Sequence, residues 1–129
     1  SDWFYQRAFR DRQLSDAEVE AALQRGTPGD VQRLMICSSL TTNQGLSRAL
    51  EDHWMGLTRL CLGSCRPGGR AERMPQITGA ALTGLVRAGP LRLRVLTLVD
   101  VAEVPLDKIA SCCPSLRALA LRGSLLRAS

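Results

Sequence analysis

The side chains that could do covalent or metal chemistry in this chain are one histidine and five cysteines. They are His53, Cys37, Cys61, Cys65, Cys112 and Cys113. A cysteine nucleophile needs a histidine base nearby and a third group that orients the base, and the strand cysteines here fall at positions expected to serve packing. Zinc usually needs four ligands at tight spacings, but the Cys61-x-x-x-Cys65 pair is separated from Cys112-Cys113 by further repeats. We therefore predict no enzymatic activity, no metal and no cofactor.

The sequence also lacks the residues of a nucleotide-binding loop. The Gly68-Gly69 pair is not followed by the Lys-Ser/Thr of a phosphate-binding loop. An odd number of cysteines with no disulfide framework predicts a reducing compartment, the cytoplasm or the nucleus. Because the chain begins at Ser1 and not at Met, we expect it to be a piece of a longer protein.

The charge of the chain comes almost entirely from arginine. A net charge of +5 arises from seventeen basic residues, of which Lys108 is the single lysine. The arginines are spread along the chain among the acids, whereas nucleic-acid binders usually gather basic residues into a patch. Nucleic-acid binding therefore stays an alternative function. With 45% hydrophobic and 22% charged residues, and no apolar run near the ~18 residues of a membrane helix, a soluble domain is expected.

One phrase, apolar-x-x-apolar-x-apolar, occurs four times, with starts 26, 36 and 23 residues apart. The four copies are Val31-Leu34-Ile36, Leu57-Leu60-Leu62, Leu93-Leu96-Leu98 and Leu116-Leu119-Leu121. Apolar residues two apart face one side of an extended chain, so each copy predicts a short strand. Between the copies, apolar residues spaced by three and four predict helices, and Ser15 with Glu18 predicts a capping box for the first helix.

Helix and strand repeated in this way predict an α/β solenoid of about four repeats over residues 15–129. No single repeat can bury its apolar face alone, but a stack of repeats buries a continuous core. We expect a parallel sheet on the inner, concave side and helices on the outer side. A polar, glycine-rich segment at 66–75 is expected to be a loop inserted between the second strand and the next helix.

The repeat resembles a known family. The stretch Leu57-Thr-Arg-Leu60-Cys-Leu62-Gly-Ser-Cys65 is similar to the leucine-rich repeat consensus, and Cys113-Pro-Ser-Leu116 resembles the entry to the strand in its cysteine-containing subtype. That subtype is best known from the substrate receptors of F-box ubiquitin ligases. The resemblance implies a non-catalytic protein-binding module. It also implies, as a narrower alternative, a substrate receptor or adaptor of a cullin-type ubiquitin ligase, with ligase subunits as partners.

Strand residues that alternate with the buried leucines should lie on the concave face and contact a partner protein. From the strands we predict the binding residues Arg33, Met35, Arg59, Cys61, Val95, Thr97, Val99 and Arg122. A contiguous exposed apolar strip normally indicates that something covers it, either a partner protein or flanking segments and termini of the chain itself. Arg33 and Arg59 should lie side by side on neighbouring strands, where an acidic side chain would bridge them. The expected partner is therefore a protein with an acidic or apolar segment.

Residues 1–14 hold four of the five aromatic residues of the chain, with arginines between them. This arm could form a short amphipathic helix. Either it caps the open end of the solenoid, or Trp3, Phe4 and Phe9 anchor a partner, since Trp, Phe and Arg dominate interface energetics. The sequence leaves both alternatives open.

Overall fold

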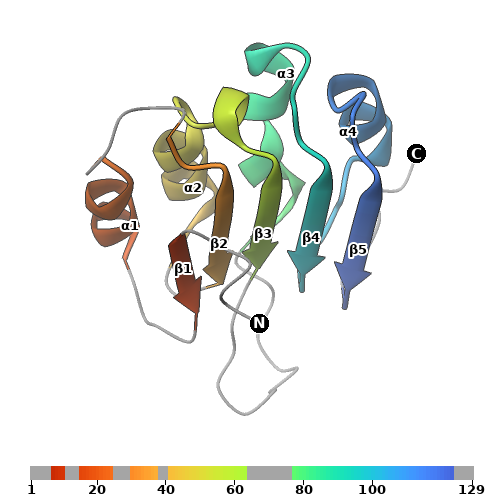
Figure 1. The fold of residues 1–129 in the computed structure, drawn as a ribbon. Helices are drawn as coiled ribbons and strands as arrows, with labels where there is room; N and C mark the ends of the chain where they lie inside the picture. The colour runs from red at the N-terminus through yellow and green to blue at the C-terminus, as the bar shows by residue number, and fades with distance from the viewer. Residues whose placement is uncertain (1–6, 11–14, 25–29, 38–40, 64–76, 124–129) are drawn as a thin grey trace.

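The computed structural model describes residues 7–10, 15–24, 30–37, 41–63 and 77–123 as one layer of strands packed on one layer of helices (Figure 1). The five strands are β1 (Arg7–Arg10), β2 (Arg33–Cys37), β3 (Arg59–Gly63), β4 (Val95–Val99) and β5 (Ala118–Arg122). The helices are α1 (Asp16–Leu23), α2 (Asn43–Leu50), α3 (Gly84–Ala88) and α4 (Leu106–Cys112), with 3-10 turns η2 (Trp54–Gly56) and η4 (Gly79–Leu82).

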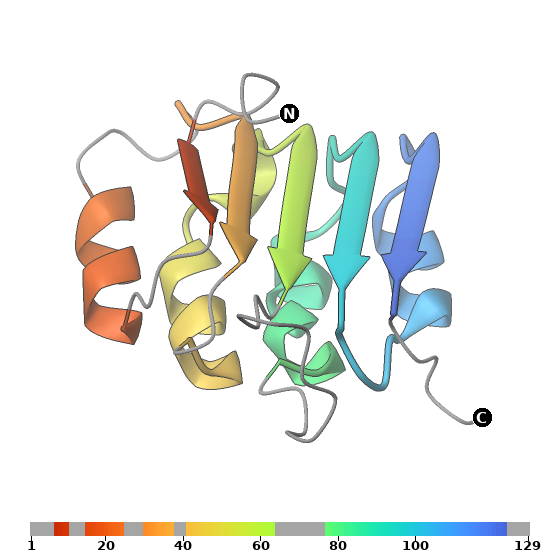
Figure 2. The ribbon, with the colours of Figure 1, turned by 90° about the horizontal axis from the view of Figure 1, so that it is seen from below.

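The sheet is parallel throughout, and its strands lie in the order of the sequence, β1-β2-β3-β4-β5. Parallel neighbours joined by connections of one hand place every connecting helix on the same face of the sheet. Figure 2 shows this arrangement, with the helices in a single layer along the row of strands. The mixed α/β class and the parallel sheet predicted from the sequence are confirmed.

All four apolar phrases form strands in one common register. Leu34, Leu60, Leu96 and Leu119 are successive Cα partners, and Ile36, Leu62, Leu98 and Leu121 form the next such row. The leucines and isoleucine of β2, β3 and β4 in these rows are all fully buried. The equivalent Leu119 is 36% exposed, because β5 is the edge strand of the described sheet. The burial expected for Leu119 is therefore only partial.

The predicted helices are present, although one of them is irregular. Ser15 and Glu18 form the expected capping box at α1, and the Thr42 hydroxyl accepts a hydrogen bond from the Gly45 amide at the start of α2. The apolar residues after β3, expected on one face of a single helix, are Ile77, Leu82, Leu85 and Val86. Instead of one helix, this segment forms η4 and the short α3. Two glycines in this segment, Gly79 and Gly84, lower its helix propensity, which accounts for the break.

The N-terminal segment differs from the expectation of an amphipathic helix, since residues 7–10 form β1. This strand pairs with β2 in parallel and places Phe9 opposite Ile36. The apolar pattern in this stretch is too short to show whether it repeats with a helical or a strand period. The edge of β2 supplies backbone hydrogen-bond partners, and pairing with that edge makes the segment a strand. Trp3 and Phe4 lie outside the described residues.

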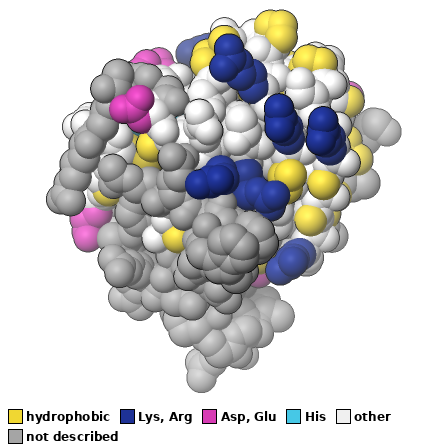
Figure 3. Space-filling view, viewed as in Figure 1, with side chains coloured by type: hydrophobic (Ala, Val, Ile, Leu, Met, Phe, Trp, Pro, Cys, Tyr) yellow, Lys and Arg dark blue, Asp and Glu magenta, His cyan; other side chains and the backbone are white. Residues whose placement is uncertain are grey.

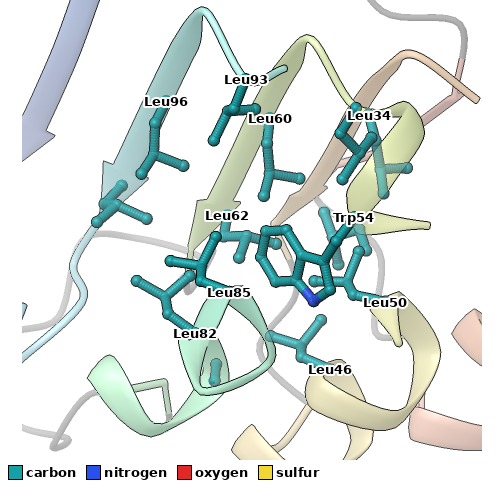
Figure 4. Packing of buried hydrophobic residues seen from close by; sticks show 14 of the residues in the cluster. Leu34, Leu46, Leu50, Trp54, Leu60, Leu62, Leu82, Leu85, Leu93 and Leu96 are labelled. Atoms are coloured by element: carbon teal, nitrogen blue, oxygen red, sulfur yellow. The ribbon is translucent and has the colours of Figure 1, made fainter. Parts of the chain in front are cut away.

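Trp54 is the largest buried side chain and lies at the centre of the core. Figure 4 shows its indole ring between Leu46 and Leu50 of α2 and Leu62 of the sheet. Gly84 makes this position possible, because a Cβ atom there would lie 2.5 Å from the indole nitrogen. The ring therefore joins the helix layer to the sheet by filling the space that a larger residue at 84 would occupy.

A chain of hydrogen bonds connects the helix starts of successive units. The Asp16 carboxylate accepts bonds from the amide (2.8 Å) and the hydroxyl (2.6 Å) of Thr42. The Asn43 side chain accepts from the Thr78 amide at 2.8 Å and donates to its hydroxyl at 2.9 Å. The Gly79 amide then donates to the Ala102 carbonyl at 2.8 Å. These bonds hold each unit to the next at the carboxyl ends of the strands.

The shared leucine register predicts opposite effects for two neighbouring substitutions in β4. Leu96→Asp places a carboxylate in a fully buried site and should cost at least about 3 kcal/mol, enough to abolish cooperative unfolding in a marginally stable domain. Thr97→Asp, one residue along on the other face, should retain a cooperative thermal transition followed by circular dichroism. Equal effects of the two substitutions would contradict the assigned faces.

The connection between α1 and α2 can be tested in the same way. Asp16→Ala removes two hydrogen bonds to Thr42 and should lower the free energy of unfolding by about 1–2 kcal/mol in urea titrations. Glu20→Ala removes the same charge from the same helix and should change stability by less than about 0.5 kcal/mol. If the Glu20 variant loses as much stability as the Asp16 variant, the link contributes nothing.

His53 makes stability depend on pH. The side chain is 5% exposed, its Nδ1 has no hydrogen-bond partner, and burial lowers its pKa from the usual 6.5 although the charge of Asp52 opposes this. The unfolded chain therefore binds a proton that the folded chain resists, so stability is lost as pH falls from about 6.5 through the lower folded pKa. We expect a lower free energy of unfolding at pH 5.5 than at pH 7.5, and a smaller difference in His53→Gln. The same pH dependence in both proteins would exclude this cause.

Candidate functional site

The face of the sheet that the helices do not cover carries three rows of side chains. Because all strands share one register, equivalent residues of successive strands lie side by side. The rows are Arg33-Arg59-Val95-Ala118, Met35-Cys61-Thr97-Ala120 and Cys37-Gly63-Val99-Arg122. The residues predicted to alternate with the buried leucines therefore do share one face of the sheet. We call it the outer face: it is the face opposite the helix layer, the one expected to be concave.

The predicted binding residues on the outer face differ in exposure. Arg33 and Arg122 are exposed, while Met35, Val95 and Thr97 are half-buried. Val99 and Arg59 are half-buried as well. In β4, accessible and buried side chains alternate along the whole strand, since its three outer residues are accessible and the two leucines between them are fully buried. The face thus presents accessible apolar side chains with arginines in the rows at both ends of the strands.

Cys61 is in the predicted row, but the expectation that it is accessible to a partner is wrong. Its side chain is only 4% exposed, and its sulfur lies 3.8 Å from the sulfur of the buried Cys37. Both are free thiols, and they pack as small apolar side chains. The register determines the row in which a residue lies. Its exposure depends on which other residues cover that row, and the apolar pattern of a single strand does not predict this.

Val99 leans over the end of β3 at Gly63. A Cβ atom at Gly63 would lie 2.5 Å from the Val99 carbonyl oxygen and 2.6 Å from its Cβ. The glycine therefore lets the two strands approach closely where the outer face ends. This close approach fixes the position of Val99, one of the predicted binding residues.

Two parts of the predicted site lie wholly or partly outside the described residues. Phe9 is in β1 next to β2, but its side chain and the whole of Trp3 and Phe4 are outside them. The same is true of the loop expected at 66–75. Binding by the aromatic arm stays a prediction.

Two exposed arginines that the strand pattern did not single out stand at the starts of β4 and β5. Arg94 and Arg117 are the second residues of their apolar phrases, one position before the strand. The Arg117 amide donates to the Arg94 carbonyl at 2.7 Å, and the Arg94 amide donates to the Thr58 carbonyl at 2.8 Å. These bonds continue the strand ladder by one residue, so the two arginines are cross-strand neighbours. Alignment of the four phrases on their first apolar residue would have identified them.

Charge is unevenly distributed over the molecule seen from the outer face. Figure 3 shows Lys and Arg side chains interspersed with hydrophobic ones over the side of β4 and β5. Most acidic side chains visible in this view lie toward α1. The surface therefore offers positive charge beside apolar groups, a combination suited to an acidic ligand with apolar side chains.

Two observations on the described residues concern metal binding and cysteine reactivity. The residues that the structure describes contain no group of three or more His, Cys, Asp or Glu side chains that could hold a metal ion. Burial raises the pKa of Cys113 to about 11, with a further rise from neighbouring Cys112. That thiol stays protonated at neutral pH and is a poor nucleophile or metal ligand.

A shallow groove of about 380 Å³ lies on the helix side, between α2 and α3. It is lined mainly by polar side chains, among them Arg48, Glu51 and Arg87. Arg48 and Arg87 are exposed, and the groove is separated from the outer face by the sheet and the core. Substitution of these two arginines is therefore a matched control for substitution of arginines on the outer face.

Within the described residues, no helix is long and apolar enough to cross a membrane. Comparisons with protein-family models, with curated proteins and with solved structures find no match for this chain.

Proposed function

We propose that this chain is a leucine-rich-repeat solenoid that binds another protein through the outer face of its sheet, without catalysis. The observation that carries the proposal is the register, which aligns Met35, Val95, Thr97 and Val99 on the face that none of the described helices covers. Accessible apolar groups gathered on one face, as Val95 and Val99 are on β4, are typical of surfaces that a partner covers.

The repeated geometry supports the solenoid. Each strand-helix unit contacts mainly the next one, through the leucine rows and through the bonds from Asp16 to Thr42 and from Asn43 to Thr78. Stability in such arrays comes from the interfaces between neighbours. The outer side chains are then held by a rigid sheet, so binding requires little ordering of the protein.

The mechanism of binding is burial of an apolar segment flanked by charge. Val95 and Val99 of β4 supply apolar area. Val95 shares its row with Arg33 and Arg59 at one end of the strands, and Val99 shares its row with Arg122 at the other end. Apolar contacts supply affinity, and peripheral charges act chiefly on the association rate and on partner choice.

Partner capture with paired variants tests this proposal. The outer-face variant Met35→Ser/Val95→Ser/Val99→Ser removes apolar contacts, and Met55→Ser/Val86→Ser is the control. Met55 and Val86 are 55% and 54% exposed and lie in η2 and α3, away from the strands. After purification from cell extract and quantitative mass spectrometry, proteins bound to the native chain should be depleted about tenfold or more only by the outer-face variant.

Retention of the same companions by the outer-face variant, with its thermal transition intact, would contradict the proposal. Elongin or cullin subunits among the companions would instead favour the ubiquitin-ligase alternative.

The variant Arg33→Glu/Arg59→Glu should leave the melting temperature unchanged and weaken the binding of an acidic partner, since both residues belong to one register row.

A further inference from the structure

We infer that the ligand of the outer face is an acidic polypeptide segment in extended conformation, held by a row of arginines across the starts of four successive strands. This inference rests on the proposed protein-binding function and adds the chemistry of the partner. Its residues are Arg33, Arg59, Arg94 and Arg117, which we call the arginine row.

The backbone places one member of the row at the start of each of β2, β3, β4 and β5. Arg33 and Arg59 are Cα partners. Arg94 and Arg117 precede the register partners of that pair, Val95 and Ala118, by one position, and the 2.7 Å bond between their backbones joins them. Both are exposed and stand before their strands begin, at the amino-terminal edge of the outer face and not within its three rows. Adjacent strands are about 4.8 Å apart, so the row spans roughly 14 Å, the length of about four residues of extended chain.

The electrostatics of the row favour an anionic ligand. Like charges directly opposite each other on neighbouring strands repel, and the backbone spacing of about 5 Å between adjacent strands is shorter than the ~8 Å screening length of physiological salt. An anion placed between Arg94 and Arg117, both exposed, relieves that repulsion and gains charge-assisted hydrogen bonds.

The composition of the outer face favours a polypeptide over a nucleic acid. Surfaces that bind single-stranded nucleic acid combine basic groups with aromatic rings on which bases stack. The described outer positions of β2 to β5 hold no aromatic residue, and the neighbours of the row are Val95 and Ala118. In an extended peptide every second side chain points to the same side, so a peptide that alternates acidic with apolar residues presents a line of carboxylates to the arginines.

Fluorescence anisotropy with matched probes tests the inference on the native chain. The probe is a labelled ten-residue peptide that alternates Glu with Val, and the control peptide has Gln in place of Glu. Arg94→Ala/Arg117→Ala should weaken binding of the Glu peptide about tenfold, the product of two exposed charge contacts of about threefold each. Arg48→Ala/Arg87→Ala removes the same charge from the groove on the helix side and should change binding less than about twofold.

Three results would overturn the inference, provided that circular dichroism shows both variants folded. They are no saturable binding of the Glu peptide, equal weakening by the two arginine pairs, and tighter binding of a short oligothymidine than of the Glu peptide. The capture experiment with the serine variants reports separately on the protein-binding function. Partner loss in the outer-face variant together with a failed peptide test would overturn the acidic chemistry alone.

Discussion

The common register of the parallel strands determines the rest of the structure. Each strand is aligned with the next so that Leu34, Leu60 and Leu96 lie in one row and Ile36, Leu62 and Leu98 lie in another, all fully buried. Since strand side chains alternate between faces, a shift of one residue would send every leucine to the opposite face. The same register that builds the core therefore selects which residues form the outer face.

Units of unequal length can keep this register because they are joined at both ends of their strands. At the amino ends, Thr58, Arg94 and Arg117 extend the backbone ladder before the strands begin. At the carboxyl ends, the Asp16 carboxylate binds Thr42 and the Asn43 amide binds Thr78. The longest interval between phrases, 36 residues, is thus accommodated between two fixed points, consistent with the slow growth of loop entropy with length.

Much of the fold could be predicted because the last two apolar residues of each phrase lie two apart, as on one face of a strand, and because the phrase recurs. The order of the strands and the shared face of Arg33 and Arg59 follow from the repeat itself. The burial of Cys61, the exposure of Leu119 and the strand at residues 7–10 depend on which neighbours cover each position. A pattern within one strand does not contain that information. Arg94 and Arg117 fall between these cases, since comparison across repeats identifies them although the alternation within a strand does not.

Cross-strand nuclear Overhauser effects measure the register most directly. In isotopically labelled protein, backbone contacts should connect Leu34 with Leu60, Leu60 with Leu96, and Leu96 with Leu119, in the pattern of parallel strands. Contacts that follow an antiparallel pattern, or that connect these leucines in a register shifted by one residue, would contradict the account. In that case the outer face and the arginine row would not exist as described.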